Sequence, residues 1–362
     1  MNERTWQGRR VLITGHTGFK GSWLALWLSR MGAQVTGLAL PADEVSLFRQ
    51  ARIGELVQHV EGDIRDVATV ERAVAAAQPE VVFHMAAQPL VRLSFAEPVE
   101  TFATNVQGTV HVLDACRRIP GLKAIVCVTS DKCYENREWI WPYRECDPMG
   151  GHDPYSASKG AAELVAAAWR RSFFDEPGTA LLATARAGNV IGGGDWAQDR
   201  LVPDIIRALI AGTEVDIRSP GSVRPWQHVL DALGGYVILA GRLLANFETG
   251  ERRLAEGWNF GPADSDAQPV GWIVERMLAA WGNDRGGWRL DHGSRVHEAR
   301  LLRLDCSKAR DELAWRPVWP LETSLEKIVA WHQAVEKGED ARAVSHEQLT
   351  NFRATYGAAL QG

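Results

Sequence analysis

The sequence predicts an α/β protein in which a doubly wound parallel sheet is joined by a smaller, mixed α/β domain. Three observations indicate this fold class. Short apolar runs alternate with segments of helical periodicity through the first half of the chain. A glycine-punctuated turn follows the first of these runs, at residues 15–21. After about residue 188 the alternation ends, and loops rich in Gly and Pro interrupt shorter elements.

The elements of the first half are expected as alternating buried strands and covering helices. Because consecutive strands are separated by helices, they should pair in parallel through right-handed crossovers. The expected strands are 10–14, 34–38, 57–61, 81–85, 124–129 and 181–186, and the expected helices are 22–31, 67–77, 99–117 and 158–174.

Two domains are predicted from the end of the strand–helix alternation at about residue 188. The sheet domain takes residues 1–188 together with about 228–260, and the smaller domain takes 189–227 and about 261–362. The smaller domain should lie over the carboxyl edge of the sheet, where ligands of open α/β sheets bind. The tail from about residue 336 is polar, and no pattern in it assigns a role.

Composition argues against several classes of protein. A formal net charge of -5 over 362 residues gives no basic footprint for nucleic acid or for an anionic membrane. No apolar run approaches the roughly 20 residues that span a bilayer, and the N-terminus has no signal-peptide pattern. The 5 cysteines are scattered without CxxC spacing, which predicts neither a disulfide framework nor a metal site. A cytoplasmic protein without a structural metal is therefore expected.

The loop after the first strand has the pattern of a dinucleotide-binding turn. Its glycines form GxxGxxG, one residue wider than the GxGxxG fingerprint. Glycine permits a tight turn and lets backbone N–H groups approach a pyrophosphate at the N-terminus of a helix. Close packing of a strand on a helix would also use glycine, but the strand-loop-helix context favours a Rossmann sheet. The expected cofactor-binding residues here are Gly15, Thr17, Gly18, Phe19 and Gly21.

The end of the second strand leaves the choice of dinucleotide open. An acidic residue there would bind a ribose 2′-OH and an Arg would bind a 2′-phosphate, but residues 37–40 are Gly-Leu-Ala-Leu. NAD is favoured over NADP only because no basic residue is evident. Asp63, followed by Ile64, comes after the third strand, where its carboxylate can accept from an adenine amino group. It could equally cap the next helix, together with Asp66.

A tyrosine and a lysine four residues apart begin a later helix. Tyr155 and Lys159 lie at i and i+4 and so share one helical face. A phenol with an ordinary pKa of about 10 is a weak base at neutral pH, but a nearby ammonium favours the phenolate. This pair is typical of a hydride-transfer site when it accompanies a dinucleotide loop, although YxxxK also occurs by chance.

These motifs together resemble the extended short-chain dehydrogenase/reductase superfamily over nearly the whole chain. Within it the chain is most similar to the nucleotide-sugar 4,6-dehydratases, and among these to the ones that act on CDP-glucose. The motifs that carry the superfamily resemblance are TGHTGFKG (14–21), GDIRD (62–66), HMAAQ (84–88), TNVQGT (104–109), TSD (129–131) and YSASK (155–159). The narrower resemblance depends on TSDKCYEN (129–136), ARAGNVIGGGDW (185–196), RPWQHVLD (224–231), WNFGP (258–262) and HEA…LDCSKAR (297–310).

The resemblance implies a reaction in three steps: oxidation at C4 of a glucosyl group, elimination of water across C5–C6, and return of the hydride to C6. Tyr155 assisted by Lys159 would take the proton of the 4-OH, with Ser130 as its hydrogen-bonding partner and Thr129 as the alternative. Asp131 and Lys132 would act as acid and base around C5 and O6. The better-known dTDP-glucose enzymes carry Asp-Glu here, so Lys132 must be neutral to act as the base. Glu135 is the alternative base, and a plain surface ion pair is the structural alternative.

The resemblance also implies further binding residues. In the sheet domain, Ala86, Ala87 and Asn105 match cofactor positions, with Asn105 more typical of a residue that fixes helices. Arg200, Leu201 and Arg224 match positions near the substrate diphosphate, and Asn189 could donate to it. Less secure matches at the nucleotide end of the substrate are Asn259 and His297.

Three other functions stay open at this point. The chain could be a dTDP- or UDP-sugar 4,6-dehydratase, or a nucleotide-sugar 4-epimerase, which needs Tyr155 and Lys159 but no acid–base pair at 131–132. A non-catalytic dinucleotide-binding regulator could dispense with both Tyr155 and Lys159. The superfamily resemblance implies a homodimer, or a higher homo-oligomer, that associates through the helices 99–117 and 158–174.

Overall fold

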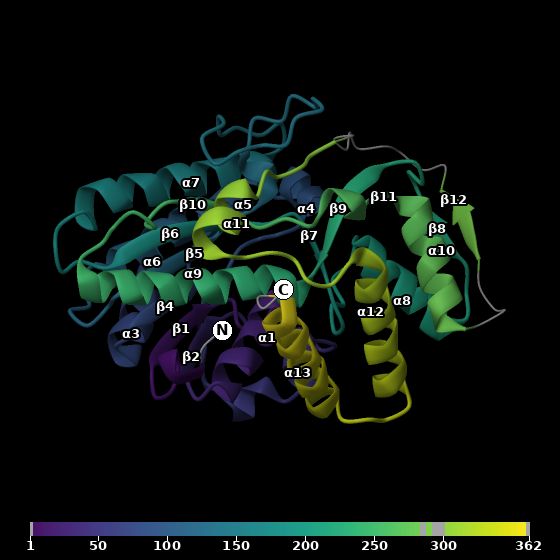
Figure 1. The fold of residues 1–362 in the computed structure, drawn as a ribbon, viewed down its shortest axis with the longest axis horizontal. Helices are drawn as coiled ribbons and strands as arrows, with labels where there is room; N and C mark the ends of the chain where they lie inside the picture. Colours follow the sequence, from purple (N-terminus) through teal and green to yellow (C-terminus); the bar gives the residue numbers. More distant parts are fainter. Residues whose placement is uncertain (1–2, 283–286, 292–300, 360–362) are drawn as a thin grey trace.

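The computed structural model describes residues 3–282, 287–291 and 301–359. Its centre is a seven-stranded sheet with the order β10-β6-β5-β4-β1-β2-β3, in which every pair of neighbours is parallel (Figure 1). The doubly wound sheet predicted from the sequence is thereby confirmed. Its strands are β1 (Arg10–Thr14), β2 (Gln34–Ala39), β3 (Gln58–Glu61), β4 (Val81–His84), β5 (Ala124–Val128), β6 (Leu181–Arg186) and β10 (Gly257–Asn259).

Alternate residues of the central strands β1, β4, β5 and β6 feed two separate cores, one on each face of the sheet. Val11 and Ile13 belong to the core that also contains α1 (Phe19–Arg30) and α9 (Val229–Thr249). Leu12 lies between them in the chain and belongs to the opposite core. Side chains of a strand point alternately to its two faces, so a short apolar run serves both layers. The helices that supply the second core are α3 (Val67–Ala77), α6 (Gly108–Cys116) and α7 (Pro154–Phe173).

Three helices differ from their predicted limits, and the first of them, α1, begins three residues before the predicted start at 22 and ends at Arg30. The predicted helix 99–117 is divided into α5 (Pro98–Phe102), a π-helical turn η3 (Ala103–Gln107) and α6. Helix α7 begins at Pro154, four residues before the predicted start at 158. Asp153 caps it, since its Oδ1 accepts from the N–H of Ser156 at 2.9 Å. Tyr155 therefore lies within the first turn of α7.

A smaller mixed α/β part follows the sixth strand, as predicted. In its three-stranded sheet β7 (Asn189–Ile191) pairs in parallel with β9 (Val223–His228), which pairs antiparallel with β11 (Ala267–Pro269). A core of its own includes Ile205 and Ile273. The predicted residue limits of the two domains stay a prediction. The other elements of this part are α8 (Leu201–Ala211), β8 (Val215–Ile217), η5 (Asp264–Asp266), α10 (Val270–Trp281), β12 (Trp288–Leu290) and α12 (Leu321–Glu336).

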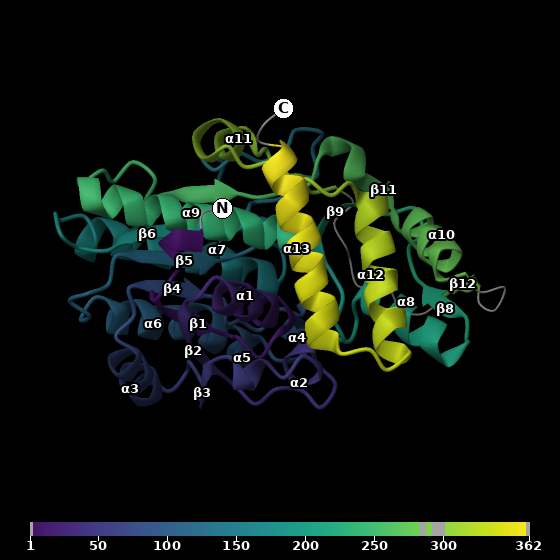
Figure 2. The same cartoon turned by 60° about the horizontal axis from the view of Figure 1, so that its bottom comes forward.

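The tail to which no role was assigned forms α13 (Ala341–Ala359), which lies beside α12 (Figure 2). Its Phe352 packs on Trp27 of α1, with ring centroids 5.7 Å apart, and on Trp319, at 5.3 Å. The polar composition of the tail reflects the exposed face of this helix. The short remaining elements are η1 (Glu3–Thr5), α2 (Leu47–Gln50), η2 (Ile53–Glu55), α4 (Val91–Ala96), η4 (Asp131–Cys133) and α11 (Ser307–Leu313).

Helix α9 is long and apolar enough to cross a membrane by length and composition, but 72% of its most apolar window is buried inside the protein. Its residues belong to the main core. A helix buried to this extent is explained as a core helix.

Candidate active site

The glycine loop forms a cradle in which side chains are sterically excluded. Gly15 has a φ of +77°, and a Cβ there would lie 2.8 Å from the backbone N and Cα of Ala86. A Cβ on Gly21 would lie 2.1 Å from the carbonyl oxygen of Gly15. Gly18 precedes α1 without any side-chain cap, and the first turn of α1 has no acidic residue. Uncapped N–H groups at a helix start bind anions, so the loop fits the diphosphate of a dinucleotide.

The other predicted cofactor residues surround this loop or brace it. The hydroxyl of Thr17 donates to the carbonyl of Leu40 at 3.0 Å, which fixes the loop to the end of β2. Phe19 begins α1, and Ala86 and Ala87 follow β4 as partly buried residues. Ile64 is buried and lies against the backbone of Gly108.

Asp63 does not cap α3. Its carboxylate pairs with the guanidinium of Arg65 at 2.6 Å, and this hydrogen bond lowers the pKa of Asp63. The cap is supplied by Asp66, which accepts from the N–H of Ala68 at 3.0 Å. Of the two roles considered for Asp63, the cap is thus taken by its neighbour, and binding of adenine stays a prediction.

Asn105 lies in the π-helical turn and uses its amide for structure. Its Oδ1 accepts from the N–H of Gln88 at 2.8 Å, and its Nδ2 donates to the carbonyl of Gln88 and to the hydroxyl of Ser158. The side chain is 2% exposed. Asn105 therefore ties the loop after β4 to α7, as expected of a residue that fixes helices.

The predicted acid–base residues converge where β5 ends. Ser130 follows the strand and begins the turn η4, which contains Asp131 and Lys132. The hydroxyl of Ser130 donates to Asp131 Oδ1 at 3.0 Å. Burial raises the pKa of Tyr155 to about 12, while a hydrogen bond with Ser130 opposes that shift. Lys132 Nζ lies 6.0 Å from the centre of the Tyr155 ring. Residues of two separate elements, η4 and α7, thus form one group.

Lys159 is a buried cation in this group. It is 6% exposed, and burial lowers its pKa to about 8. Within residues 3–282, 287–291 and 301–359, its ammonium has no hydrogen-bond acceptor and no carboxylate within ion-pair distance. An unpartnered buried cation costs free energy of folding and is therefore a sign of function.

Asp131 has the properties of a carboxyl that can carry a proton. It is 5% exposed, and burial raises its pKa above the ordinary value, although Lys132 and the Ser130 hydroxyl act against this shift. Lys132 itself is half-buried. Glu135, the alternative base, directs its carboxylate to His152, with 3.8 Å between Oε1 and Nε2, and is 42% exposed. Lys132 as the base, with Glu135 as the alternative, stays a prediction.

Thr129 and Ser130 separate into two roles. The hydroxyl of Thr129 donates to the carboxylate of Glu163 at 2.5 Å, on the inner side of α7. The hydroxyl of Ser130 instead interacts with Asp131 and Tyr155. The Ser130 hydroxyl thus lies beside Tyr155 while that of Thr129 is bonded to Glu163, and the catalytic role of Ser130 stays a prediction.

Some of the predicted substrate residues lie near the acid–base group, and others do not. Arg200 precedes α8 and pairs with Asp195 at 3.3 Å, while its charge also acts on Tyr155. Arg224 lies in β9, and its charge lowers the pKa of Asp131 against the effect of burial. Both arginines therefore lie within electrostatic reach of the acid–base group. Asn189 begins β7 and Leu201 begins α8.

Asn259, in contrast, is buried with no exposed surface. Its Nδ2 donates to the carbonyls of Tyr143 and Asp305, and its Oδ1 accepts from the hydroxyl of Tyr134. These contacts use the amide fully for structure, so we do not place Asn259 in the site. His297 lies outside the described residues.

The comparison with known proteins decides the family. The model of the family described as GDP-mannose 4,6 dehydratase matches residues 12–328. The chain belongs to this family. A CDP-glucose 4,6-dehydratase of Salmonella typhimurium is 53% identical over 357 residues, which cover 97% of this chain and 98% of the relative. A dTDP-glucose 4,6-dehydratase of Streptomyces antibioticus is 29% identical and covers 89% of this chain and 92% of its own.

Solved structures of other dehydratases and epimerases share the fold. A dTDP-glucose 4,6-dehydratase of Bacillus anthracis in complex with NAD has a TM-score of 0.74 at 21% identity, covering 92% of this chain and 100% of that one. A UDP-glucose 4-epimerase of Thermotoga maritima has a TM-score of 0.75 at 23% identity, covering 90% and 99%. This chain therefore has the same fold as a dehydratase and an epimerase of nucleotide sugars.

Sequence reasoning missed one cation of this dehydratase site. Lys20 lies in the first turn of α1, and burial together with the charges of Lys159 and Arg200 lowers its pKa to about 7. Its Nζ is 5.9 Å from the centre of the Tyr236 ring. The sequence could have indicated Lys20, because it is the charged residue of the glycine loop at residues 14–21. This partly buried lysine, on which the charge of Asp131 acts, adds a second amine whose charge can change near neutral pH.

Proposed function

We propose that the protein is a CDP-glucose 4,6-dehydratase that converts CDP-D-glucose to CDP-4-keto-6-deoxy-D-glucose and water, a reaction of deoxysugar biosynthesis of the lipopolysaccharide O-antigen type. The observation that carries this proposal is the convergence of Ser130, Asp131 and Lys132 with Tyr155 and Lys159 at the end of β5. The relative of 53% identity over nearly the full length supports CDP-glucose as the substrate.

In the first step, Tyr155 takes the proton of the 4-OH while Ser130 hydrogen-bonds the same oxygen. A phenol whose pKa is raised to about 12 needs help to ionise at neutral pH. The ammonium of Lys159 supplies it, because a buried cation one helical turn away favours the phenolate. Bound NAD supplies the chemistry of hydride acceptance at C4 and hydride return at C6. The glycine loop around Gly15 and Gly21 would hold its diphosphate.

In the second step, the 4-ketone makes the C5 proton acidic, and the elimination needs one base and one acid. Lys132 takes the C5 proton. Asp131 protonates the leaving O6, for which its raised pKa is suited. Both groups belong to one short turn, so they can flank the same bond of the sugar.

Binding of the sugar diphosphate is assigned to Arg200 and Arg224, with Asn189 as a donor. Two guanidinium groups on the side of the smaller part would neutralise the diphosphate. We also propose a cytoplasmic homodimer. Its location is supported by five unpaired cysteines. Association is supported by exposed apolar residues on α5 and α7, namely Val99, Phe102, Leu164 and Phe173.

The test is incubation of the protein with NAD and separately with CDP-glucose, dTDP-glucose, UDP-glucose and GDP-mannose. Conversion of CDP-glucose to a keto product that has lost one water, seen by mass spectrometry, is expected. Equal or faster conversion of dTDP- or UDP-glucose would move the substrate to that nucleotide. A C4 epimer of unchanged mass would refute the dehydratase in favour of an epimerase. Absence of turnover with all four, despite NAD binding, would favour a regulator.

A further inference from the structure

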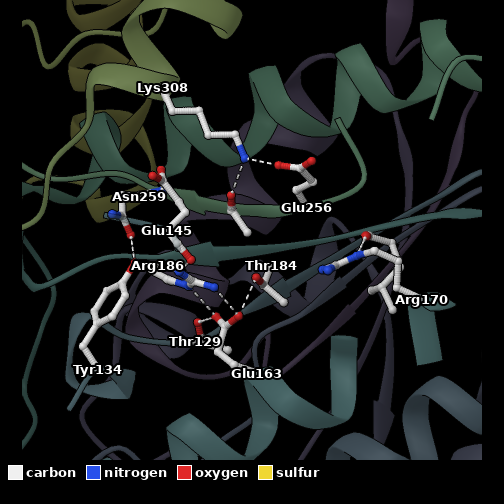
Figure 3. Close-up of polar contacts among 12 residues, drawn as sticks. Thr129, Tyr134, Glu145, Glu163, Arg170, Thr184, Arg186, Glu256, Asn259 and Lys308 are labelled. Atoms are coloured by element: carbon white, nitrogen blue, oxygen red, sulfur yellow. Dashed lines mark hydrogen bonds and ion pairs between the residues drawn. The ribbon is translucent and has the colours of Figure 1, made fainter. Parts of the chain in front are cut away.

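A buried ion pair behind the site joins the helix of Tyr155 to the edge of the sheet. Glu163 lies on α7 one turn after Lys159, and Arg186 is the last residue of β6. The two side chains meet through two parallel contacts, Nη2 to Oε2 at 2.7 Å and Nε to Oε1 at 2.9 Å (Figure 3). Each side chain is only 5% exposed. This is the bidentate geometry in which a buried arginine and carboxylate interact best.

The carboxylate of Glu163 is fully occupied by four donors. Besides the two guanidinium contacts, Oε1 accepts from the hydroxyl of Thr129 at 2.5 Å and Oε2 accepts from that of Thr184 at 2.8 Å. Burial disfavours its charge, but Arg186 and these hydroxyls keep the pKa of Glu163 below its ordinary value. The group is therefore a charged, rigid anchor at the point where β5, β6 and α7 meet.

Arg186 also contacts the chain on the C-terminal side of the segment Ser130–Lys132. Its Nη1 donates to the hydroxyl of Tyr134 at 2.6 Å and to the carbonyl of Glu145. Thr129 directly precedes Ser130, and Tyr134 follows Lys132 after a single residue. The ion pair thus holds the chain on both sides of the segment Ser130–Lys132, and through Glu163 it also holds the helix that carries Tyr155 and Lys159.

We propose that Glu163 and Arg186 are positioning residues that fix the segment Ser130–Lys132 relative to Tyr155 and Lys159. The inference rests on the proposed function, in which the two steps draw on η4 and α7 yet act on adjacent carbons of one sugar ring. A misplacement of about 1 Å between such groups can cost a factor of about 100 in rate. Neither positioning residue touches the sugar in this role, so their loss should lower kcat and leave KM nearly unchanged.

The charge of Glu163 has a second, measurable effect. Burial is the largest influence on the pKa of Lys159 and lowers it, while Cys127, Cys133 and Glu163 act in the opposite direction. Burial raises the pKa of both thiols, so Glu163 is the one of the three that carries a charge near neutral pH. His84 and Lys20 are the other titratable groups that interact with Lys159. Replacing Glu163 by a neutral residue also leaves Arg186 as an unpaired cation nearby. The pKa of Lys159 should then fall, and the alkaline limb of the rate profile should move to lower pH.

The experiment uses Glu163→Gln, which keeps the shape and removes the charge, and Thr129→Val, which removes one hydroxyl at constant charge. Expected results for Glu163→Gln are a fall in kcat of at least about tenfold with KM within about threefold. The pH midpoint for acylation of Lys159, followed site by site by mass spectrometry without substrate, should fall. In Glu163→Asp, which keeps the charge, the pH midpoint for acylation of Lys159 should lie closer to the wild-type value than in Glu163→Gln. Thr129→Val should lower kcat with no change in the midpoint.

Asp231→Asn is the matched control, because Asp231 is a fully buried carboxylate that accepts from the N–H groups of Val318 and Trp319 and is not among the groups that interact with Lys159. It should lower stability without changing kcat or the Lys159 midpoint. Wild-type kcat in both Glu163→Gln and Thr129→Val would overturn the proposal, as would an equal loss of kcat in the control. If Glu163→Gln does not fold, wild-type kcat in Thr129→Val alone overturns the proposal, and a lowered kcat supports it.

Failure of the proposed function is recognised separately. If the wild-type protein does not convert CDP-glucose, the measurements move to the substrate that it does convert. The acylation of Lys159 needs no substrate, so an unchanged midpoint in Glu163→Gln refutes the electrostatic part of the inference whatever the reaction is.

Discussion

Replacement of Lys159 by methionine should stabilise the fold while it abolishes activity. Lys159 is buried and its ammonium has no hydrogen-bonding partner within the described part of the chain, so the folded state bears the cost of its charge. Methionine has a similar length and no charge, so it should fill the space with little strain. The hydride step would lose the cation that assists Tyr155, and turnover should fall by a factor of about 100 or more.

The size of the stabilisation follows from the pKa of Lys159, which burial lowers from 10.5 to about 8. That shift corresponds to about 3 kcal/mol when the lysine is protonated in both states, as at pH 7. Because the folded pKa is the lower one, the unfolded chain binds more protons between about pH 8 and pH 10.5. The stability of the wild-type protein therefore rises with pH through that window, and the advantage of Lys159→Met should shrink to about 1 kcal/mol at pH 9.5.

The assay is urea unfolding of the cofactor-free protein at pH 7 and pH 9.5 for wild type and Lys159→Met. Lys337→Met serves as the control, since Lys337 is an exposed lysine at the end of α12 and should change stability by less than about 0.5 kcal/mol at either pH. A Lys159→Met variant that is less stable than wild type at pH 7 would refute the reasoning. So would an advantage that is the same at both pH values.

Three further substitutions test the site. Lys132→Ala should still allow oxidation at C4, so enzyme-bound NADH should accumulate without the keto-deoxy product; unchanged turnover would remove Lys132 from the mechanism. Tyr155→Phe should lower the rate of NADH formation in a single turnover by about 100-fold or more, and a rate near wild type would show that another base serves the 4-OH. Gly21→Ala places a Cβ 2.1 Å from the carbonyl oxygen of Gly15, so the loop must shift. Its affinity for NAD, measured by calorimetric titration, should fall at least about tenfold, and wild-type affinity would disprove the tight fit of the cradle.

Local patterns were sufficient for six of the seven strands of the central sheet, though not for β10, and for the shared helical face of Tyr155 and Lys159. β1, β6 and α3 have the limits expected from apolar periodicity, because each of these elements buries a regular set of side chains. The spacing of Tyr155 and Lys159 is enough by itself to put both side chains on one helical face. Such features depend on residues that lie close together in the chain.

Features that depend on distant residues were not predictable in this way. The π-helical turn at Ala103–Gln107 accompanies bonds from Asn105 to Gln88 and Ser158, neither of which its own sequence indicates. Likewise, WNFGP suggested a ligand contact for Asn259, but its amide bonds to Tyr134, 125 residues away. A family motif records that a residue is needed, and the fold decides whether it serves the ligand or the scaffold.

The position of α13 has a consequence for how the protein is made. Phe352 covers Trp27 of α1, and Trp331 of α12 donates to the hydroxyl of Ser345. Arg342 also reaches back to the carbonyl of Ala51 at 2.7 Å. During synthesis the first helix therefore leaves the ribosome more than 300 residues before its cover does. The nascent chain must keep an indole-lined surface from aggregating throughout that interval, so an interrupted product that stops before α13 should be a substrate for chaperones and proteases.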